Sequence, residues 1–315
     1  MESSISVDGI REAVGVIDPV FLNSPQFDCE PLSRRLGVPT VLKVETANPI
    51  RSFKGRGTDF LLHRLGSKTP PLVCASAGNF GQGMAFACRK RGVRLTVFAS
   101  HKANPLKLAR MRELGAKIEL EVGDFDDAKA AARRHAEKHG EHFIEDGLID
   151  AIGEGAGTIG LELTQREKLD AVFVPLGNGS LVNGVGTWIK HASPETRVVA
   201  VCAERAPSMA LSWRARKAVD APSDSIADGI AVRVPIPAAV DITLRTVDDV
   251  ALVSDEAMRK WTRHVFLDAG LVVEPSAAAG LAAIAERAGE LDGRRVATIL
   301  TGGNLTEQQI REWLF

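Results

Sequence analysis

One lysine of the sequence lies in a context that suits covalent chemistry. Lys54 belongs to the segment NPIRSFKGRG, and its Asn48-Pro49 pair favours a turn, so a helix can begin only after it. Lys54 would then lie near a helix start, where the positive end of the helix dipole favours a neutral amine. A neutral amine is the form that makes Schiff bases. The alternative is a surface lysine in a run of charged residues, and this segment alone leaves both open.

Two loops of small residues have the pattern of anion sites. ASAGNFGQG (75–83) and PLGNGSL (175–181) each follow an expected strand and open an expected helix, so their N–H groups could bind a carboxylate or a phosphate. A tight turn without a ligand explains the first loop equally well. In the second loop Ser180 adds a hydroxyl, but Val182 stands where a dinucleotide fingerprint needs a third glycine, and a Walker lysine is missing. We therefore expect one phosphate there, not a dinucleotide.

A threonine, with its hydroxyl group, directly follows the last expected strand. Thr301, in LTGGN (300–304), could bind a ligand or cap the final helix. Together, the four segments would bring a reactive lysine, a carboxylate site, a phosphate site and a hydroxyl to the ends of strands and helices.

The elements that position these residues alternate between short β-branched runs and longer amphipathic segments, as in parallel sheets flanked by helices. Because the loops at the carboxyl ends of such strands meet, two α/β lobes predict a ligand between them. We expect strands at 72–75, 95–99, 117–122, 142–144, 171–174, 197–203, 251–253 and 296–300. We expect helices at 81–91, 105–115, 126–138, 158–167, 255–267 and 277–287, and a loop over 218–248.

Composition excludes several classes of partner. The chain has 315 residues with 39 Lys+Arg and 40 Asp+Glu, and this balance argues against nucleic acid or an anionic membrane as the main partner. The chain has no tyrosine, which argues against a surface on which nucleic-acid bases stack. The four cysteines have no zinc-site spacing, and free thiols suit a cytoplasmic location. Neither a signal peptide nor a bilayer span is expected.

Six segments, in this order, resemble the fold type II (β-family) pyridoxal-phosphate enzymes, and the threonine/serine dehydratase branch most closely. They are SFKGRG (52–57), SAGNFGQG (76–83), GNGSL (177–181), SIADGIAV (225–232), VVEPSAAAG (272–280) and LTGGN (300–304). The resemblance implies the α/β fold of the tryptophan synthase β subunit. Its large domain would comprise 1–66 and 148–315, and its small domain 67–147.

The resemblance also implies a role for individual residues. Lys54 would hold pyridoxal 5'-phosphate covalently and later move protons. Ser76, Ala77, Gly78 and Asn79 would bind the substrate carboxylate, and Asn79 would also bind the phenolic oxygen of the cofactor. The other cofactor-binding positions would be Phe53 and Gly229 on the two ring faces, Gly177, Asn178, Gly179, Ser180 and Leu181 at the phosphate, Glu274 nearby, and Thr301 at the pyridine nitrogen.

The implied activity is β-elimination from a hydroxy amino acid such as L-threonine or L-serine, which releases a 2-keto acid and ammonia. A threonine hydroxyl at 301 cannot keep the ring nitrogen protonated as an acid would, which favours elimination or replacement over transamination. A threonine synthase-like or other replacement enzyme is the alternative. We also expect a homodimer.

Some positions depart from the family pattern. Arg51 precedes SFK where small residues are usual, so it is either a solvated charge or a contact for an acidic substrate. Metal-binding members carry an acidic pair where this chain has Glu204 and Ala210, so we expect no metal. Serine racemases carry a second serine where this chain has Ala77, so we expect almost no D-isomer.

Overall fold

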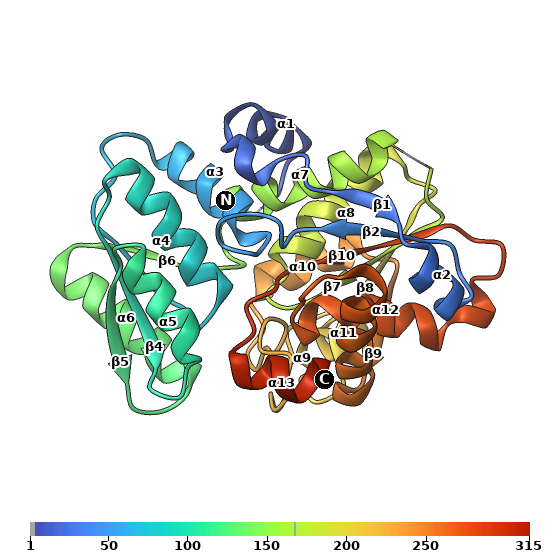
Figure 1. Cartoon of the computed structure of the whole chain (residues 1–315). Coiled ribbons are helices and arrows are strands. Elements are labelled where there is room, and N and C mark those ends of the chain that lie inside the picture. The colour runs from blue at the N-terminus through green and yellow to red at the C-terminus, as the bar shows by residue number, and fades with distance from the viewer. Residues whose placement is uncertain (1–3, 167) are drawn as a thin grey trace.

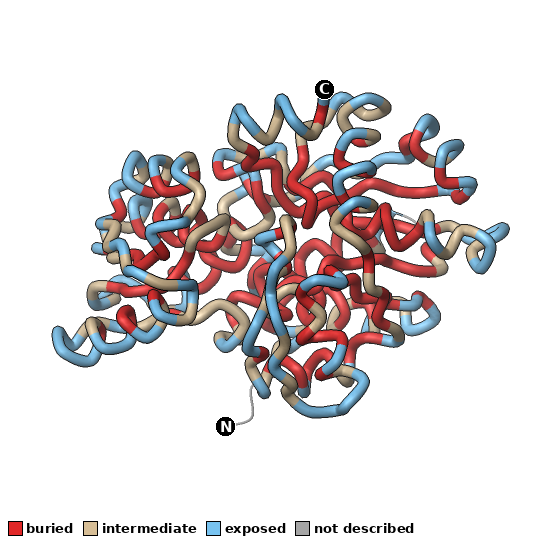
Figure 2. The backbone as a smooth tube through the Cα atoms, turned by 90° about the horizontal axis from the view of Figure 1, so that it is seen from below, coloured by how far each residue is buried: buried red, intermediate tan, exposed pale blue. Residues whose placement is uncertain are grey.

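The computed structural model describes residues 4–166 and 168–315, which form two α/β lobes (Figure 1). Within these residues the larger sheet has six strands, and all neighbours are parallel except the first pair. Their spatial order is β1 (Gln26–Asp28), β2 (Thr40–Val44), β10 (Val296–Leu300), β7 (Ala171–Pro175), β8 (Arg197–Ala203) and β9 (Asp249–Val253). Figure 2 shows the buried residues in the interior of the molecule and the exposed residues around them.

Helices cover both faces of the larger sheet because its strand residues point alternately to either side. In β7, Phe173 packs into one apolar cluster, while Val172 and Val174 pack into the other. The first face carries α2 (Glu30–Leu36), α11 (Asp255–Ala269) and α12 (Pro275–Glu286). The second carries α7 (Asp150–Arg166), α8 (Ser180–Ala192), α9 (Ser208–Ala215) and α10 (Pro237–Thr246). The remaining elements near this lobe are α1 (Val7–Val16), η1 (Pro19–Phe21), η2 (Ala288–Glu290) and α13 (Glu307–Leu314).

The smaller sheet is parallel throughout and lies between residues 72 and 144. Its spatial order is β5 (Lys117–Glu121), β4 (Leu95–Ser100), β3 (Leu72–Ala75) and β6 (His142–Ile144). Helix α6 (Phe125–His139) covers one face, and α4 (Asn79–Arg91) and α5 (Pro105–Glu113) pack on the other. The two lobes thus confirm the expected fold class, while the expected domain boundaries stay a prediction.

An apolar cluster joins the smaller sheet to the helix that begins at Lys54, α3 (Lys54–Leu65). Phe60 and Leu62 of α3 pack in one buried cluster with Leu72 and Cys74 of β3 and Met84 of α4. We call these five residues the bridging core. It fixes α3 against the smaller sheet.

Several sequence predictions are confirmed to the residue. The strands at 72–75, 142–144, 197–203 and 296–300 begin and end where expected. Asn104 caps α5 by accepting hydrogen bonds from the backbone N–H of Leu106 and Lys107, and Pro105 occupies the first helical position. Within the described ranges, no helix combines the length and apolar content of a membrane span.

Two predictions are wrong in part. The helix expected at 158–167 begins at Asp150, and Glu167 lies outside the described residues. Glycines at its start do not break it but allow contact with α3: a Cβ on Gly155 would lie 2.6 Å from the Cα of Gly57. The loop expected over 218–248 contains α10, because Pro237 stands at the first turn, where a helix tolerates proline.

Candidate active site

A cavity of about 430 Å³ lies between the lobes, and both contribute its walls. The structure brings nearly all the sequence-predicted site residues to it. Those that line it are Phe53, Lys54, Ser76, Ala77, Gly78, Asn79, Gly177, Asn178, Gly179, Ser180, Leu181, Gly229 and Thr301. Glu274 lies behind this wall, where it contacts Asn79.

Lys54 is the first residue of α3, at the helix start that the sequence predicted. A turn organised by Asn48 precedes it, since the Asn48 side chain accepts hydrogen bonds from the backbone N–H of Ile50 and Ser52. The next residues are tied to the end of β10: the N–H of Phe53 donates to the carbonyl of Thr301 at 3.1 Å. Lys54 and Thr301 therefore reach the cavity side by side, although they are far apart in the sequence.

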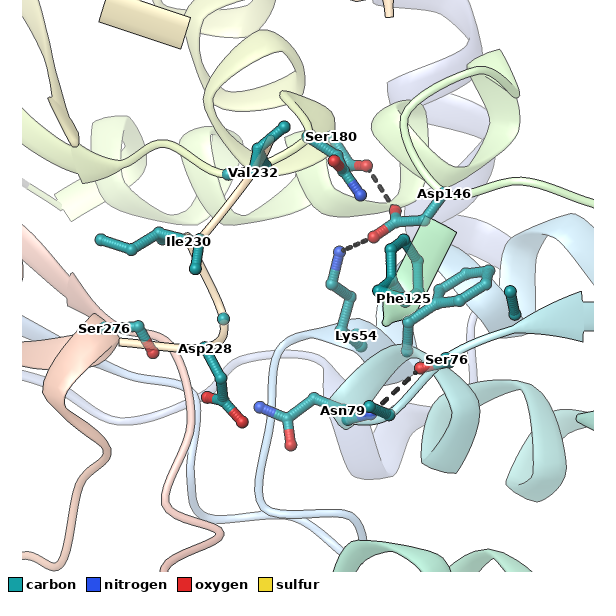
Figure 3. Close-up of a pocket in the computed structure, with 18 of the residues that line it drawn as sticks. Lys54, Ser76, Asn79, Phe125, Asp146, Ser180, Asp228, Ile230, Val232 and Ser276 are labelled. Carbon is teal, nitrogen blue, oxygen red and sulfur yellow. Dashed lines mark hydrogen bonds and ion pairs between the residues drawn. The ribbon is translucent and has the colours of Figure 1, made fainter. Parts of the chain in front are cut away.

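The Lys54 side chain has one acidic partner, which sequence reasoning missed. Its Nζ lies 2.6 Å from Oδ2 of Asp146, in the loop after β6. Oδ1 of Asp146 accepts a hydrogen bond from Oγ of Ser180 at 2.6 Å (Figure 3). The same Nζ lies 4.8 Å from the ring centre of Phe53. The carboxylate thus connects Lys54 to the predicted phosphate loop.

The loop 76–79 leads into α4. Oγ of Ser76 accepts hydrogen bonds from the N–H of Gly78 at 3.2 Å and of Gly81 at 2.9 Å, which curls the loop around the helix start. The first-turn N–H groups of a helix have no acceptor within it. With the dipole of the thirteen-residue α4, the first-turn N–H groups that do not donate to Ser76 can bind a carboxylate.

A second lysine stands beside this loop and was also missed. Nζ of Lys107 lies 2.8 Å from Asp228 and 3.7 Å from the buried Glu274, and a Cβ on Gly78 would lie 3.9 Å from it. Burial alone would lower the pKa of Lys107, but Glu274 and Asp228 outweigh this effect and raise it. Lys107 therefore keeps its positive charge beside the 76–79 loop.

Glu274 organises the wall behind Asn79. Its carboxylate accepts hydrogen bonds from Nδ2 of Asn79 at 3.1 Å and from the N–H of Asn304 at 2.7 Å. Burial raises the pKa of Glu274, and the charge of Lys107 offsets this only in part. The network fixes the orientation of the Asn79 amide at the cavity wall.

The loop 177–180 ends at the first residue of α8, Ser180. A Cβ on Gly177 would lie 2.8 Å from the carbonyl oxygen of Gly229, so the two predicted segments meet with no room for a side chain. Gly179 has a φ of 98°, a conformation that glycine adopts without strain. The loop therefore presents backbone and the Ser180 hydroxyl to the cavity.

A buried ionic cluster underlies α3. The guanidinium of Arg56 is fully buried and bonds to Glu45 at 2.8 Å, to Glu162 at 2.6 Å and to Oγ1 of Thr158 at 2.9 Å. Lys43 lies 2.5 Å from Glu162. The charges of two cations and two carboxylates thus balance in the interior. Arg56, at the centre of this cluster, is two residues after Lys54 in α3.

Two departures from the family pattern can be located. Arg51 is exposed, has a φ of 50°, and accepts a hydrogen bond from the N–H of Gly303 with its backbone carbonyl. Among the described residues, no group of three His, Cys, Asp or Glu side chains is arranged to hold a metal ion.

Comparison with known proteins identifies the family. The family described as pyridoxal-phosphate dependent enzyme matches residues 17–302. The chain is 32% identical over 310 residues to an L-threonine ammonia-lyase of Thermotoga maritima, covering 97% of this chain and 77% of the relative. It is 30% identical to a biosynthetic L-threonine dehydratase of Pasteurella multocida, covering 91% of this chain but only 57% of the relative.

The structure resembles maize serine racemase, with a TM-score of 0.91, 26% identity, and coverage of 99% of this chain and 97% of the other. The family match spans far more than half of the sequence, and the relatives are similar over almost all of it. The chain therefore belongs to the pyridoxal-phosphate dependent enzymes of fold type II.

Proposed function

We propose that the protein is an ammonia-lyase that removes the β-hydroxyl and the amino group of a small hydroxy amino acid, L-threonine or L-serine, to give a 2-keto acid and ammonia. One observation carries the proposal: a single cavity joins Lys54, a helix start suited to a carboxylate and a glycine loop suited to a phosphate. The threonine ammonia-lyase and dehydratase names of the relatives support the substrate class.

The residues present fit pyridoxal phosphate. The contact between Gly177 and Gly229 leaves only backbone where a phosphate would approach, and Ser180 and the positive end of α8 supply donors. Lys54 would bind the cofactor covalently, with Phe53 and Gly229 beside its ring, Asn79 at its phenolic oxygen and Thr301 at its ring nitrogen. When bound, the cofactor supplies an electron sink for the bond electrons of the substrate α-carbon.

The chain's own groups would then bind and deprotonate the substrate. The N–H groups of Ala77 and Asn79 bind the α-carboxylate, and the Lys107 cation stabilises it from the side of Gly78. Nζ of Lys54 accepts the α-proton. The β-hydroxyl leaves as water, and the proton that it gains balances the α-proton taken up by Lys54. The released enamine product takes up water to give the 2-keto acid and ammonia.

A substrate survey tests this proposal. The purified protein with added pyridoxal phosphate is incubated with each proteinogenic amino acid, and keto acid and ammonia are measured together. We expect both products in equal amounts from L-threonine or L-serine. If neither amino acid gives keto acid, and phosphate is released from an O-phosphorylated amino acid instead, the protein is a replacement enzyme of the threonine synthase kind.

The identity of residue 77 should limit the reaction to one stereochemical course. The methyl group of Ala77 lines the cavity and cannot donate a proton, so we expect no D-serine above background from L-serine. Ala77→Ser should raise D-serine formation about a hundredfold, the lower end of what a positioned general acid contributes. Chiral chromatography after incubation with L-serine measures this.

Ala75→Ser is the matched control for that variant, since it adds the same hydroxyl to the cavity wall at the end of β3. It should leave D-serine at background. Substantial D-serine from the unmodified protein would mean that another side chain supplies the proton.

We also propose that the protein is a cytoplasmic homodimer. Its four free, buried cysteines support a reducing compartment. Burial raises the pKa of both Cys88 and Cys202 to about 12, so these thiols are unreactive. Light scattering that gives twice the mass of the chain would support the dimer, and the mass of one chain would exclude it.

A further inference from the structure

Asp146 contacts two of the groups that line the cavity. Its Oδ2 is 2.6 Å from Nζ of Lys54, and its Oδ1 accepts a hydrogen bond from Oγ of Ser180 at 2.6 Å (Figure 3). The side chains of Lys54 and Asp146 are only 13% and 12% exposed, so water screens this pair weakly. The carboxylate is thus bound at both ends.

Both partners of Asp146 are groups that the proposed function assigns to the cofactor. A serine hydroxyl has one proton to donate, and Ser180 donates it to Asp146. Nζ of Lys54 would have to form a covalent bond to the cofactor, which removes the ammonium that pairs with the carboxylate. A phosphate bound at Ser180 would also face the negative charge of Asp146, and like charges repel. The cofactor and Asp146 therefore compete.

The backbone around Asp146 is held in place, so its side chain must be the part that moves. Gly147 has a φ of 93°, and a Cβ there would lie 2.7 Å from the carbonyl oxygen of Asn178 in the glycine loop. This close approach leaves the backbone next to Asp146 little room to shift, and rotation of the Asp146 side chain is the simplest way to release Lys54 and Ser180.

We propose that Asp146 is a built-in competitor of the cofactor: its carboxylate occupies the anion site formed by Lys54 and the start of α8, and cofactor binding displaces it. The proposal rests on the proposed function, in that Lys54 and Ser180 are taken as cofactor contacts. It assigns to Asp146 the control of cofactor affinity, a role distinct from binding substrate.

Asp146→Asn tests the proposal because it removes the charge and keeps the shape. The full chain is stripped of cofactor with hydroxylamine and titrated with pyridoxal phosphate, and bound cofactor is measured by dialysis and by visible absorbance, without an activity assay. We expect the variant to bind about tenfold more tightly or better. With pyridoxal, which lacks the phosphate, the increase in affinity from Asp146→Asn should be smaller. Pyridoxal neither competes for the Ser180 hydroxyl nor brings a negative charge close to Asp146.

Glu145→Gln is the matched control. It removes the same charge one residue away, but from a carboxylate that pairs with Lys129 and Arg133 and not with Lys54. Its affinity for pyridoxal phosphate should stay within about twofold of the parent. Asp146→Ala repeats the measurement with a smaller uncharged side chain, in case the asparagine variant does not fold.

The outcomes separate the two proposals. Equal or weaker binding of pyridoxal phosphate by the uncharged variants overturns the role of Asp146 and leaves the proposed function intact. Failure of the unmodified protein to bind the cofactor covalently overturns the proposed function itself.

Discussion

Replacing Lys54 with alanine is expected to lower keto acid formation by about 10³-fold or more, since the variant loses both the covalent attachment point and the proton acceptor at the α-carbon. The unmodified protein should be yellow, and borohydride should fix the cofactor on Lys54. Mass spectrometry of the labelled peptides measures the attachment directly and does not depend on turnover.

The second lysine of the cavity makes this experiment selective. Lys107 lies in the same cavity but is held between Asp228 and Glu274, so the label should be absent from its peptide. Lys129→Ala removes another cavity lysine, which pairs with Glu145, and should keep the label at position 54. A colourless protein, or a label on Lys107, would contradict the assignment of Lys54.

Arg56→Met should lower the free energy of unfolding by about 3–5 kcal/mol, the usual cost of leaving buried carboxylates without their cation. Glu45 and Glu162 would remain in the interior with only Lys43 to balance them. Urea denaturation at pH 7 measures the loss. Arg34→Met is the control: Arg34 pairs with Glu30 at 3.5 Å on the surface, and its loss should leave the urea midpoint unchanged.

The cost of Arg56→Met should depend on pH. Burial works to raise the pKa of Glu162, but Arg56 and Lys43 outweigh it and hold the pKa below the ordinary value of 4.5. A carboxyl with a lowered folded-state pKa stabilises the fold above its ordinary pKa, and this contribution is lost as the pH falls through the lowered value. The unfolding curves of parent and variant should therefore converge in acid, and a constant difference from pH 7 to pH 3 would contradict the ionic origin.

The sequence predicted the site loops well because each has a strong local signal. Asn48-Pro49 fixes where a helix can start, and the glycines of 177–179 follow a strand of buried residues, so Lys54 and Ser180 could be located from neighbouring residues alone. The helix over Asp150–Arg166 was partly missed because its glycines weaken the local helix signal, while contact with α3 stabilises it.

The ionisable neighbours of the site could not be found in this way. Asp146 is one acid in a loop, and its contact with Lys54 depends on how the lobes meet. Lys107 did offer a signal: it lies one turn before the buried Met111 on α5, so it falls on the apolar face of the helix. A lysine on such a face needs an acidic partner, but the sequence does not identify Asp228 and Glu274 as those partners.

The bridging core has a consequence for cooperativity. Since Phe60 and Leu62 of α3 share one apolar cluster with Leu72, Cys74 and Met84, separating the lobes would expose apolar surface on both. The smaller sheet therefore cannot open far from α3 without loss of its own core, and the protein should unfold as one unit. The slowest-exchanging amides of β3 and β10 would then report the same global opening.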